Sequence, residues 1–214
     1  MKKLVLLPLV IVSLLAGADE NLFGYSSSTD TLPQGAWEIY QWMTYRSQKS
    51  QGTYEALDYR TEIEYGWTNT LSQAFYFNFR QHKIQGSAPL DDTGAPEYED
   101  RLTGVRFQGV QTAFKYNVLS VYQDVMGLAF YFEPGFSQVF KISGQEQEEY
   151  SFEVKTLLQK NFLDDLMAIV LNLNLEHEAR RLQGSTWEKE LAVEATAGIS
   201  YRFIPKWFGG LEAR

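Results

Sequence analysis

Polar and apolar residues alternate at every second position over long stretches of this chain, and no other feature restricts its fold as strongly. Residues 57–67 show the pattern most clearly, with Leu57, Tyr59 and Ile63 on one parity and Asp58 and Glu62 on the other. Successive side chains of a β-strand point to opposite faces. Residues 57–67 therefore predict a strand with one apolar and one charged face, whereas a helix would scatter both classes around its axis.

The same alternation recurs along the chain and predicts eight strands, with a ninth that begins near Trp207. The expected strands cover residues 36–47, 57–67, 75–82, 110–117, 126–133, 150–159, 167–178 and 190–203. At about 8–14 residues over these ranges, they exceed the roughly five or six residues that are common in soluble sheets. Their length suits tilted strands that cross a bilayer, which need about 9–11 residues in the apolar zone.

The expected connections alternate between short and long. Short ones cover 67–70, 119–124, 161–165 and 204–206, and longer or more polar ones cover 48–53, 85–103, 135–149 and 179–187. Outer-membrane barrels have short periplasmic turns and longer outer loops. The alternation predicts an up-and-down meander with its N-terminus in the periplasm and with residues 85–103 as an outer loop.

The first 18 residues have the features of a secretory signal peptide. Met1, Lys2 and Lys3 form a short positive region, residues 4–15 are mostly apolar, and residues 16–18 read Ala-Gly-Ala. The apolar run is too short for a membrane helix, which needs roughly 20 residues. We therefore expect residues 1–18 to be removed, residues 19–214 to form one domain, and no transmembrane helix after residue 18.

Alternation alone leaves open which face is outside, because a lipocalin-like barrel would turn its apolar face inward. Mixed charges on the polar parity, and aromatic residues near strand ends such as Tyr65, Trp67, Tyr201 and Phe203, favour lipid on the apolar face. The expected fold is an all-β, antiparallel, up-and-down transmembrane β-barrel of at least eight strands. The segment from Trp207 reads as the start of a further strand, so we expect 10–12 strands in a chain truncated at its C-terminus. The alternative is an eight-stranded barrel with a short tail.

Composition excludes several classes of function. The formal charge of −8 argues against a nucleic-acid binder, which would need a basic face. The chain has no Cys and only two His, so it offers no thiolate chemistry and little for a metal site. We expect neither a cofactor nor a metal.

The polar parity supplies a set of charged residues that we expect to line the lumen. They are Asp58, Arg60, Glu62, Glu64, Arg80, Lys115, Glu133, Glu153, Lys155, Glu176, Glu178, Glu190, Glu194 and Arg202. One interpretation is a lumen cross-linked by ion pairs between neighbouring strands. The other is a polar channel with a mild preference for cations, which requires a barrel wide enough to leave an aqueous path. We favour the ion-paired lumen.

A catalytic site in a barrel enzyme would need a nucleophile with a His base at the rim. His82 and His177 fall near the outer ends of their expected strands, but no nucleophile, base and orienting group can be assembled around either. Both histidines are therefore expected to be girdle residues at the rim, and we expect no enzyme activity.

Three segments carry a resemblance to a known group of proteins. They are TLPQGAWEIYQWMTYR (31–46), DYRTEIEYGWTNTLSQAFYFNF (58–79) and FYFEPGF (130–136). The chain resembles, over residues 22–214, uncharacterised Gram-negative outer-membrane barrels, and it is similar to outer-membrane proteins linked with phenol meta-pathway degradation. The resemblance implies a location in the bacterial outer membrane and a barrel fold, with solute passage by association. It supplies no catalytic residues.

The first functional hypothesis is therefore passive passage of small solutes. The alternative is a structural or surface-interaction barrel whose lumen is plugged by side chains, and a lipid-modifying enzyme is a third hypothesis. Expected partners are membrane lipid, lipopolysaccharide and, during biogenesis, the barrel-assembly machinery.

Overall fold

The computed structural model describes residues 22–47, 52–86, 100–182, 184–205 and 207–214. The expected signal peptide and residues 87–99 of the expected outer loop lie outside this described part of the chain. Among the described residues, none belongs to a helix with the length and apolarity to span a membrane.

Every regular element of the described chain is a β-strand, which confirms the all-β prediction. The strands are β1 (Trp37–Ser47), β2 (Thr53–Thr68), β3 (Leu71–Gln85), β4 (Arg101–Leu102), β5 (Arg106–Leu119), β6 (Gly127–Val139), β7 (Glu146–Phe162), β8 (Met167–Leu182), β9 (Glu188–Ile204) and β10 (Trp207–Ala213). Strands β2, β3 and β5–β9 have 13–17 residues and are longer than the alternation alone suggested.

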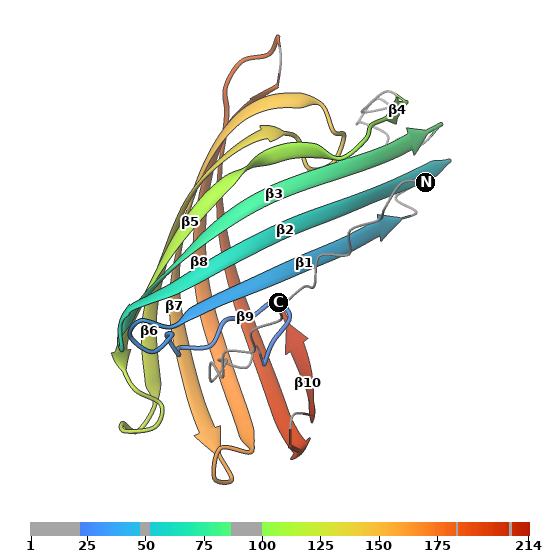
Figure 1. Ribbon diagram of the computed structural model, residues 1–214. Helices are drawn as coiled ribbons and strands as arrows, with labels where there is room; N and C mark the ends of the chain where they lie inside the picture. Colours follow the sequence, from blue (N-terminus) through green and yellow to red (C-terminus); the bar gives the residue numbers. More distant parts are fainter. Residues whose placement is uncertain (1–21, 48–51, 87–99, 183, 206) are drawn as a thin grey trace, which may run out of the picture.

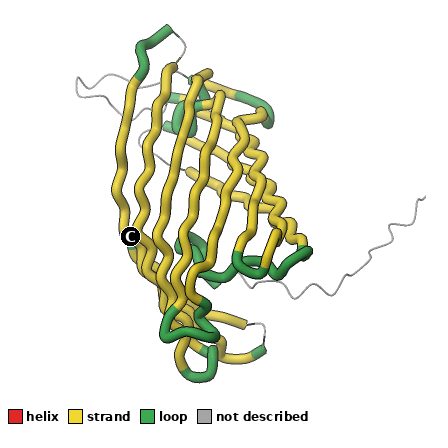
Figure 2. Tube along the Cα trace, turned by 90° about the vertical axis from the view of Figure 1, so that its left-hand side faces the viewer, coloured by secondary structure: helices red, strands yellow, loops and turns green. Residues whose placement is uncertain are grey.

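The strands form one antiparallel, up-and-down sheet in the order β1-β2-β3-β5-β6-β7-β8-β9-β10, with the short β4 paired to β3. The sheet curls into a half-barrel, and its short connections gather at one end (Figures 1 and 2). Two expected long loops are shorter than predicted. In the loop expected at 135–149, β6 continues through Pro134 and Gly135 to Val139 and β7 already begins at Glu146, and in the loop expected at 179–187, β8 continues to Leu182. Proline and the acidic run at 146–149 looked like loop composition, but ladder pairs from Phe136 to Tyr150 and from Ser137 to Glu149 hold both segments in the sheet.

The convex face is apolar, and the concave face carries the charged and polar side chains together with small buried clusters of Ala, Tyr, Leu and Val. Large apolar side chains in the middle of the outward parity are exposed, including Phe77 (40%), Leu173 (50%) and Val193 (80%). Buried residues of the opposite parity include Asn172 and Thr196. A lipocalin-like arrangement, with the apolar face lining the cavity, is therefore wrong for this sheet.

The expected closed barrel is not what the described residues form, because β1 and β10 do not pair with each other. Eight antiparallel pairings separate them along the sheet, so the two edge strands run in the same direction. Direct pairing of β1 with β10 would therefore be parallel, which an up-and-down meander does not use. Antiparallel closure needs one further strand, or another odd number, between these two edges.

Residues 22–34, which we call the strap, link the two edges at the short-turn end. The strap runs along the concave face from β10 to the hairpin between β2 and β3, and then enters β1 (Figure 1). At that point Gly35 N donates to Gly66 O at 2.8 Å and Gly66 N donates to Ala36 O at 3.0 Å. A side chain at position 66 would clash with the strap, because a Cβ there would lie 2.2 Å from Pro33 O.

Candidate functional site

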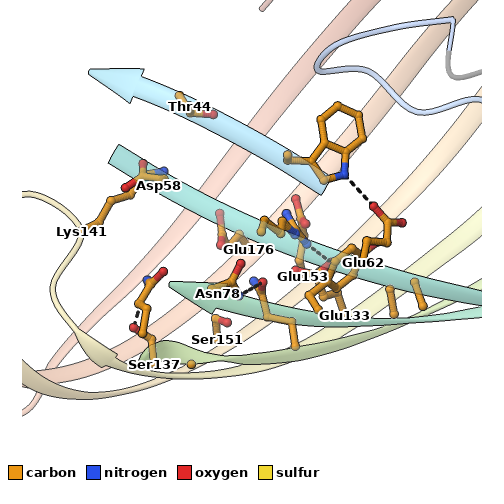
Figure 3. Close-up of a pocket in the computed structure, with 18 of the residues that line it drawn as sticks. Thr44, Asp58, Glu62, Asn78, Glu133, Ser137, Lys141, Ser151, Glu153 and Glu176 are labelled. Carbon is orange, nitrogen blue, oxygen red and sulfur yellow. Dashed lines mark hydrogen bonds and ion pairs between the residues drawn. The ribbon is translucent and has the colours of Figure 1, made fainter. Parts of the chain in front are cut away.

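The concave face encloses a cavity of about 680 Å³, which we call the chamber. Its walls come from β1, β2, β3 and β5–β8 (Figure 3). Strap residues 23–28 line it near the short-turn end, and residues 140–142 of the turn between β6 and β7 line it toward the long-loop end. The lining is mainly polar, and this arrangement makes the chamber the candidate functional site.

Eleven of the fourteen residues that the sequence placed in the lumen line the chamber. They are Asp58, Arg60, Glu62, Glu64, Arg80, Lys115, Glu133, Glu153, Lys155, Glu176 and Glu178. The other three, Glu190, Glu194 and Arg202, share the parity of buried Thr196 and Ser200 on β9 but do not line the cavity. Their strand lies next to β10 at the open edge, where no opposing wall encloses them.

Several lining residues were not in the predicted set. On β1, Tyr40, Trp42 and Arg46 all face the chamber, and Trp42 Nε1 donates to Glu62 Oε2 at 2.9 Å (Figure 3). These residues could have been found, because Tyr40 and Trp42 stand on the parity opposite Trp37. Lys141 could not have been predicted as a lining residue, because it lies in a turn and no local sequence pattern indicates that this turn folds inward.

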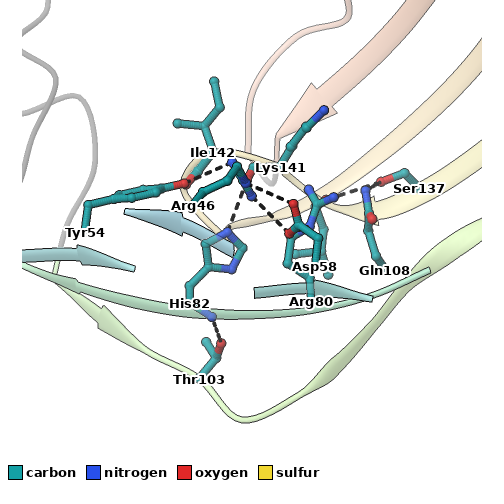
Figure 4. A network of polar contacts seen from close by, with 11 residues as sticks. Arg46, Tyr54, Asp58, Arg80, His82, Thr103, Gln108, Ser137, Lys141 and Ile142 are labelled. Carbon is teal, nitrogen blue, oxygen red and sulfur yellow. Dashed lines mark hydrogen bonds and ion pairs between the residues drawn. The ribbon is translucent and has the colours of Figure 1, made fainter. Parts of the chain in front are cut away.

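A shared counter-ion organises the long-loop end of the chamber. Asp58 accepts from Arg46, with Nε–Oδ2 at 2.9 Å and Nη2–Oδ1 at 3.1 Å, and its Oδ1 also lies 2.7 Å from Arg80 Nε (Figure 4). The three side chains are 7–16% exposed. Within this cluster one carboxylate faces two buried guanidinium groups, so the cluster itself keeps an excess of positive charge.

The turn between β6 and β7 folds inward onto this cluster. Lys141 O accepts from Arg46 Nη2 at 2.8 Å and lies 3.2 Å from His82 Nε2, and Ile142 O accepts from Tyr54 at 2.9 Å (Figure 4). Ile142 also packs on the apolar cluster that contains Tyr54 and Ile84. These contacts attach the turn to β1–β3 on the opposite wall. Burial, together with the positive charges of Arg80 and Arg46, lowers the pKa of Lys141.

The expectation that both histidines lie at the rim as girdle residues is wrong for His82. Its side chain points inward and is 1% exposed, held under the turn at Lys141 and Gly144. The parity of β3 already favoured an inward position, but the turn that buries the ring is a tertiary contact. His177 lies on the convex side and is exposed.

An acidic row crosses the opposite wall. Glu133 of β6, Glu153 of β7 and Glu176 of β8 are direct register partners on three neighbouring strands. Arg60 reaches across the chamber to Glu133 at 3.3 Å, and Lys155 pairs with Glu153 at 3.0 Å. Like charges directly opposite one another are destabilising in a sheet, so this row is costly and only partly neutralised.

Side chains from four strands, β5, β7, β8 and β10, hold the strap by its backbone. The Glu212 carboxylate accepts from the backbone N–H groups of Gly24, Tyr25 and Ser26 at 2.7, 3.0 and 2.6 Å. Asn172 pairs with Ser27 in both directions, accepting from its N–H at 2.7 Å and donating to its carbonyl at 3.0 Å.

Further along the strap, three inward side chains hold two residues. Gln159 Oε1 accepts from Thr29 N at 2.8 Å, and Asn117 Nδ2 donates to Thr29 O at 2.7 Å. Lys115 Nζ donates to Asp30 O at 2.7 Å. Burial raises the pKa of the Asp30 carboxyl, and the charge of Lys115 offsets part of that rise. The strap is thus held at the short-turn end of the chamber through hydrogen bonds from its backbone to side chains of the sheet.

Within the described ranges, no group of three or more His, Asp or Glu side chains is arranged to hold a metal ion.

A comparison with protein families finds one whose model matches residues 15–214, and its description is a family of unknown function (DUF6662). No curated protein matches the chain.

Proposed function

The chain belongs to the DUF6662 family, and we propose that it is an integral β-barrel protein of a bacterial outer membrane that admits small polar solutes to its lumen. The distribution of side chains over the two faces supports membrane insertion. Exposed Phe, Leu and Val cover the convex face, and the charged residues gather on the concave face. A contiguous exposed apolar surface of this kind marks an interaction site, and a lipid bilayer would cover it on all strands at once.

Aromatic residues at the two ends of the convex face support the same proposal. Trp37, Tyr65 and Trp67 cluster at the short-turn end, with ring centroids 4.4 and 4.9 Å apart. At the long-loop end Tyr150 stacks on Trp187 at 6.1 Å. Tryptophan and tyrosine girdles at both interfaces are typical of outer-membrane barrels.

A bilayer has no water to satisfy the free edges of β1 and β10, so the barrel has to be closed there. Because these edges run in the same direction, the covering element is a strand antiparallel to both. Closure of this kind would also complete the wall beside β9, where Glu194 and Arg202 would then face the lumen.

The unfilled chamber carries the proposal of solute passage. A barrel with a purely structural role has its interior packed with side chains, whereas a cavity of about 680 Å³ remains between the strap and the turn at residues 140–145. The strap blocks the short-turn end, so passage requires it to move. We propose that the strap is the gate.

The second candidate is the structural or surface-interaction barrel with a permanently closed lumen. The observation that favours it is the number of anchors on the strap, including the three N–H groups held by Glu212 and the paired amide of Asn172. The two candidates differ in whether the strap ever leaves its site.

A reversible covalent lock distinguishes them in planar bilayers. Ser26 Oγ and Thr196 Oγ1 lie 3.3 Å apart, and the chain has no Cys, so Ser26→Cys with Thr196→Cys introduces one disulfide between strap and wall. We expect unitary current steps from the wild type and from the reduced double variant, and silence after oxidation. Each single-Cys variant serves as the matched control and should conduct under both conditions.

Two outcomes would contradict this. Equal conductance of oxidised and reduced double variant would mean that the strap is not the gate. Silence of every variant, with heat-modifiable folding retained, would reject the channel and favour the closed barrel.

We propose no enzyme activity. Absence of labelling by a serine-directed covalent probe supports this, and labelling would contradict it. The outer-membrane location, contact with lipopolysaccharide, assembly by the barrel-assembly machinery and the link to phenol degradation stay predictions.

A further inference from the structure

Charged groups that are unpaired or share a counter-ion gather at two places on the chamber wall. Figure 3 shows Lys141 beside Asp58 at one end, with Glu176, Glu153 and Glu133 further in. The separation matters because an enclosed cavity with opposite charges at two points is complementary to a guest whose own charges are separated.

The long-loop end has excess positive charge. Asp58 is shared between Arg46 and Arg80, and Lys141 Nζ has no ion-pair or hydrogen-bond partner among the described residues. Arg80 is only 7% exposed, and its buried Nη1 likewise has no hydrogen-bond partner in the described part of the chain. Burying such a group without a partner is costly, which suggests that a ligand supplies the missing acceptor.

The wall formed by β7 and β8 has excess negative charge. Glu153 and Glu133 have Lys155 and Arg60 as partners. Glu176 and Glu178 also line the cavity, and neither side chain forms an ion pair or hydrogen bond among the residues that the structure describes, although the charges of Lys155 and Lys141 act on Glu176 from a greater distance. Glu149 of β7 accepts from the neutral amide of Gln147 at 2.7 Å and forms no ion pair among the described residues, although the charges of Arg180 and Arg80 act on it from a greater distance.

We propose that the chamber binds a small zwitterion, with its carboxylate at Arg80 and Lys141 and its ammonium group at Glu176 and Glu178. This rests on the proposed function, since it names the class of solute that the lumen admits. A simple anion would face the glutamates and a simple cation would leave the basic end unpaired, so each would satisfy one end only. A cavity of about 680 Å³ lies within the range of roughly 300–1,000 Å³ that small-molecule sites occupy.

Three peptides of one length test the inference. Triglycine carries both charges, N-acetyl-triglycine carries only the carboxylate, and triglycine amide carries only the ammonium group. Calorimetric titration of the folded protein in detergent micelles should show triglycine binding at least about tenfold more tightly than either blocked peptide, since each blocked peptide lacks one charged hydrogen-bonded contact.

Two variants test which end of the chamber binds the carboxylate and which binds the ammonium group. Lys141→Gln should abolish the preference for triglycine over its amide and keep the preference over the N-acetyl peptide, and Glu178→Gln should do the reverse. Lys83→Gln and Glu55→Gln are matched controls, because this exposed pair, 49% and 40% accessible, does not line the chamber. Both controls should retain the full discrimination.

Equal binding of the three peptides, preference for either blocked peptide, or no binding by the folded protein would overturn the inference. Because the titration is done in micelles, its result is independent of conductance. A protein that conducts without discriminating contradicts only the zwitterion site, and one that discriminates without conducting contradicts only the channel.

Discussion

Asp58 is the residue on which the charge balance of the long-loop end depends most. It accepts from Arg46 through both carboxylate oxygens and lies 2.7 Å from Arg80, and all three side chains are largely buried. Taking charges out of water costs free energy that only close pairing repays. The free energy gained by pairing with the Asp58 carboxylate therefore has to offset the desolvation cost of two guanidinium groups.

Asp58→Asn should lower the free energy of unfolding by about 3 kcal/mol, because removing one partner leaves buried charge uncompensated. Urea unfolding in micelles, monitored by tryptophan fluorescence, measures this loss of free energy. Glu55→Gln breaks the exposed pair with Lys83 at 3.4 Å and should cost below about 1 kcal/mol. Equal losses in the two variants would show that the buried network has no special weight.

Asp30 should make stability depend on pH. Burial raises the pKa of its carboxyl in the folded chain, so the folded state binds this proton more tightly than the unfolded state, where the pKa is about 4. Stability therefore falls as pH rises from about 4 through the folded pKa. Asp30→Asn should unfold at higher urea concentration than the wild type at pH 7 and at the same concentration at pH 3. An equal midpoint at pH 7 would contradict the burial effect.

At the scale of elements, the strap differs from the strands in what holds it. Strands share ladder hydrogen bonds with two neighbours, whereas the strap depends on single side chains such as Glu212, Asn172 and Gln159. Two close approaches add to these bonds, since a Cβ at Gly198 would lie 2.8 Å from the ring of Phe23 and one at Gly127 would lie 2.3 Å from Thr29 Oγ1. Release of the strap would therefore break side-chain contacts and leave the ladder pairs of the sheet in place.

Asn172→Leu should release the strap selectively. It removes both hydrogen bonds to the Ser27 peptide group, and each buried group left unsatisfied costs about 1–3 kcal/mol. Amide hydrogen exchange in residues 22–34 should accelerate at least tenfold while exchange in β7 and β8 is unchanged. Asn174→Leu is the matched control, because Asn174 lies on the same face two residues away and contacts Glu194 instead of the strap. Equal acceleration in both variants would contradict the role of Asn172.

For the whole molecule, the side chains on the two faces of the sheet indicate which surroundings, water or lipid, each face favours. The apolar face is exposed and the charged face is enclosed, the reverse of a soluble barrel. In water this arrangement would leave aromatic and aliphatic surface exposed along every long strand. In a bilayer the same surface is buried, and only the edges at β1 and β10 remain to be covered.

Depth in the proposed bilayer can be tested with one substitution at two positions. Leu173 lies mid-strand on the outward face of β8, and Leu191 lies near the start of β9 on the same face, so the two substitutions are Leu173→Arg and Leu191→Arg. A basic residue costs roughly 2–4 kcal/mol at mid-bilayer and about 0–1 near an interface. Folding into lipid vesicles should therefore be strongly reduced for Leu173→Arg and nearly normal for Leu191→Arg. Similar yields for the two variants would contradict the membrane proposal.

The sequence by itself determined the strands, their antiparallel order and the parity that faces the chamber. Side-chain alternation is a local property of the extended backbone, so residues such as Asp58, Glu133 and Glu176 could be assigned to one face from their positions alone. Some loop boundaries were predicted wrongly because they were inferred from composition. Pro134 and Gly135 are typical of loops, yet they lie inside β6.

Only the tertiary structure decided what closes the chamber and where its charges remain unpaired. Two of the bonds that hold the strap span 145 and 188 residues of sequence, between Ser27 and Asn172 and between Gly24 and Glu212. The inward turn that buries His82 reaches it from 59 residues away. Such bonds join a backbone group to a side chain on a distant strand, and no periodicity records them. The open edge at β9 and β10, which keeps Glu190, Glu194 and Arg202 out of the cavity, likewise depends on how far the sheet curls.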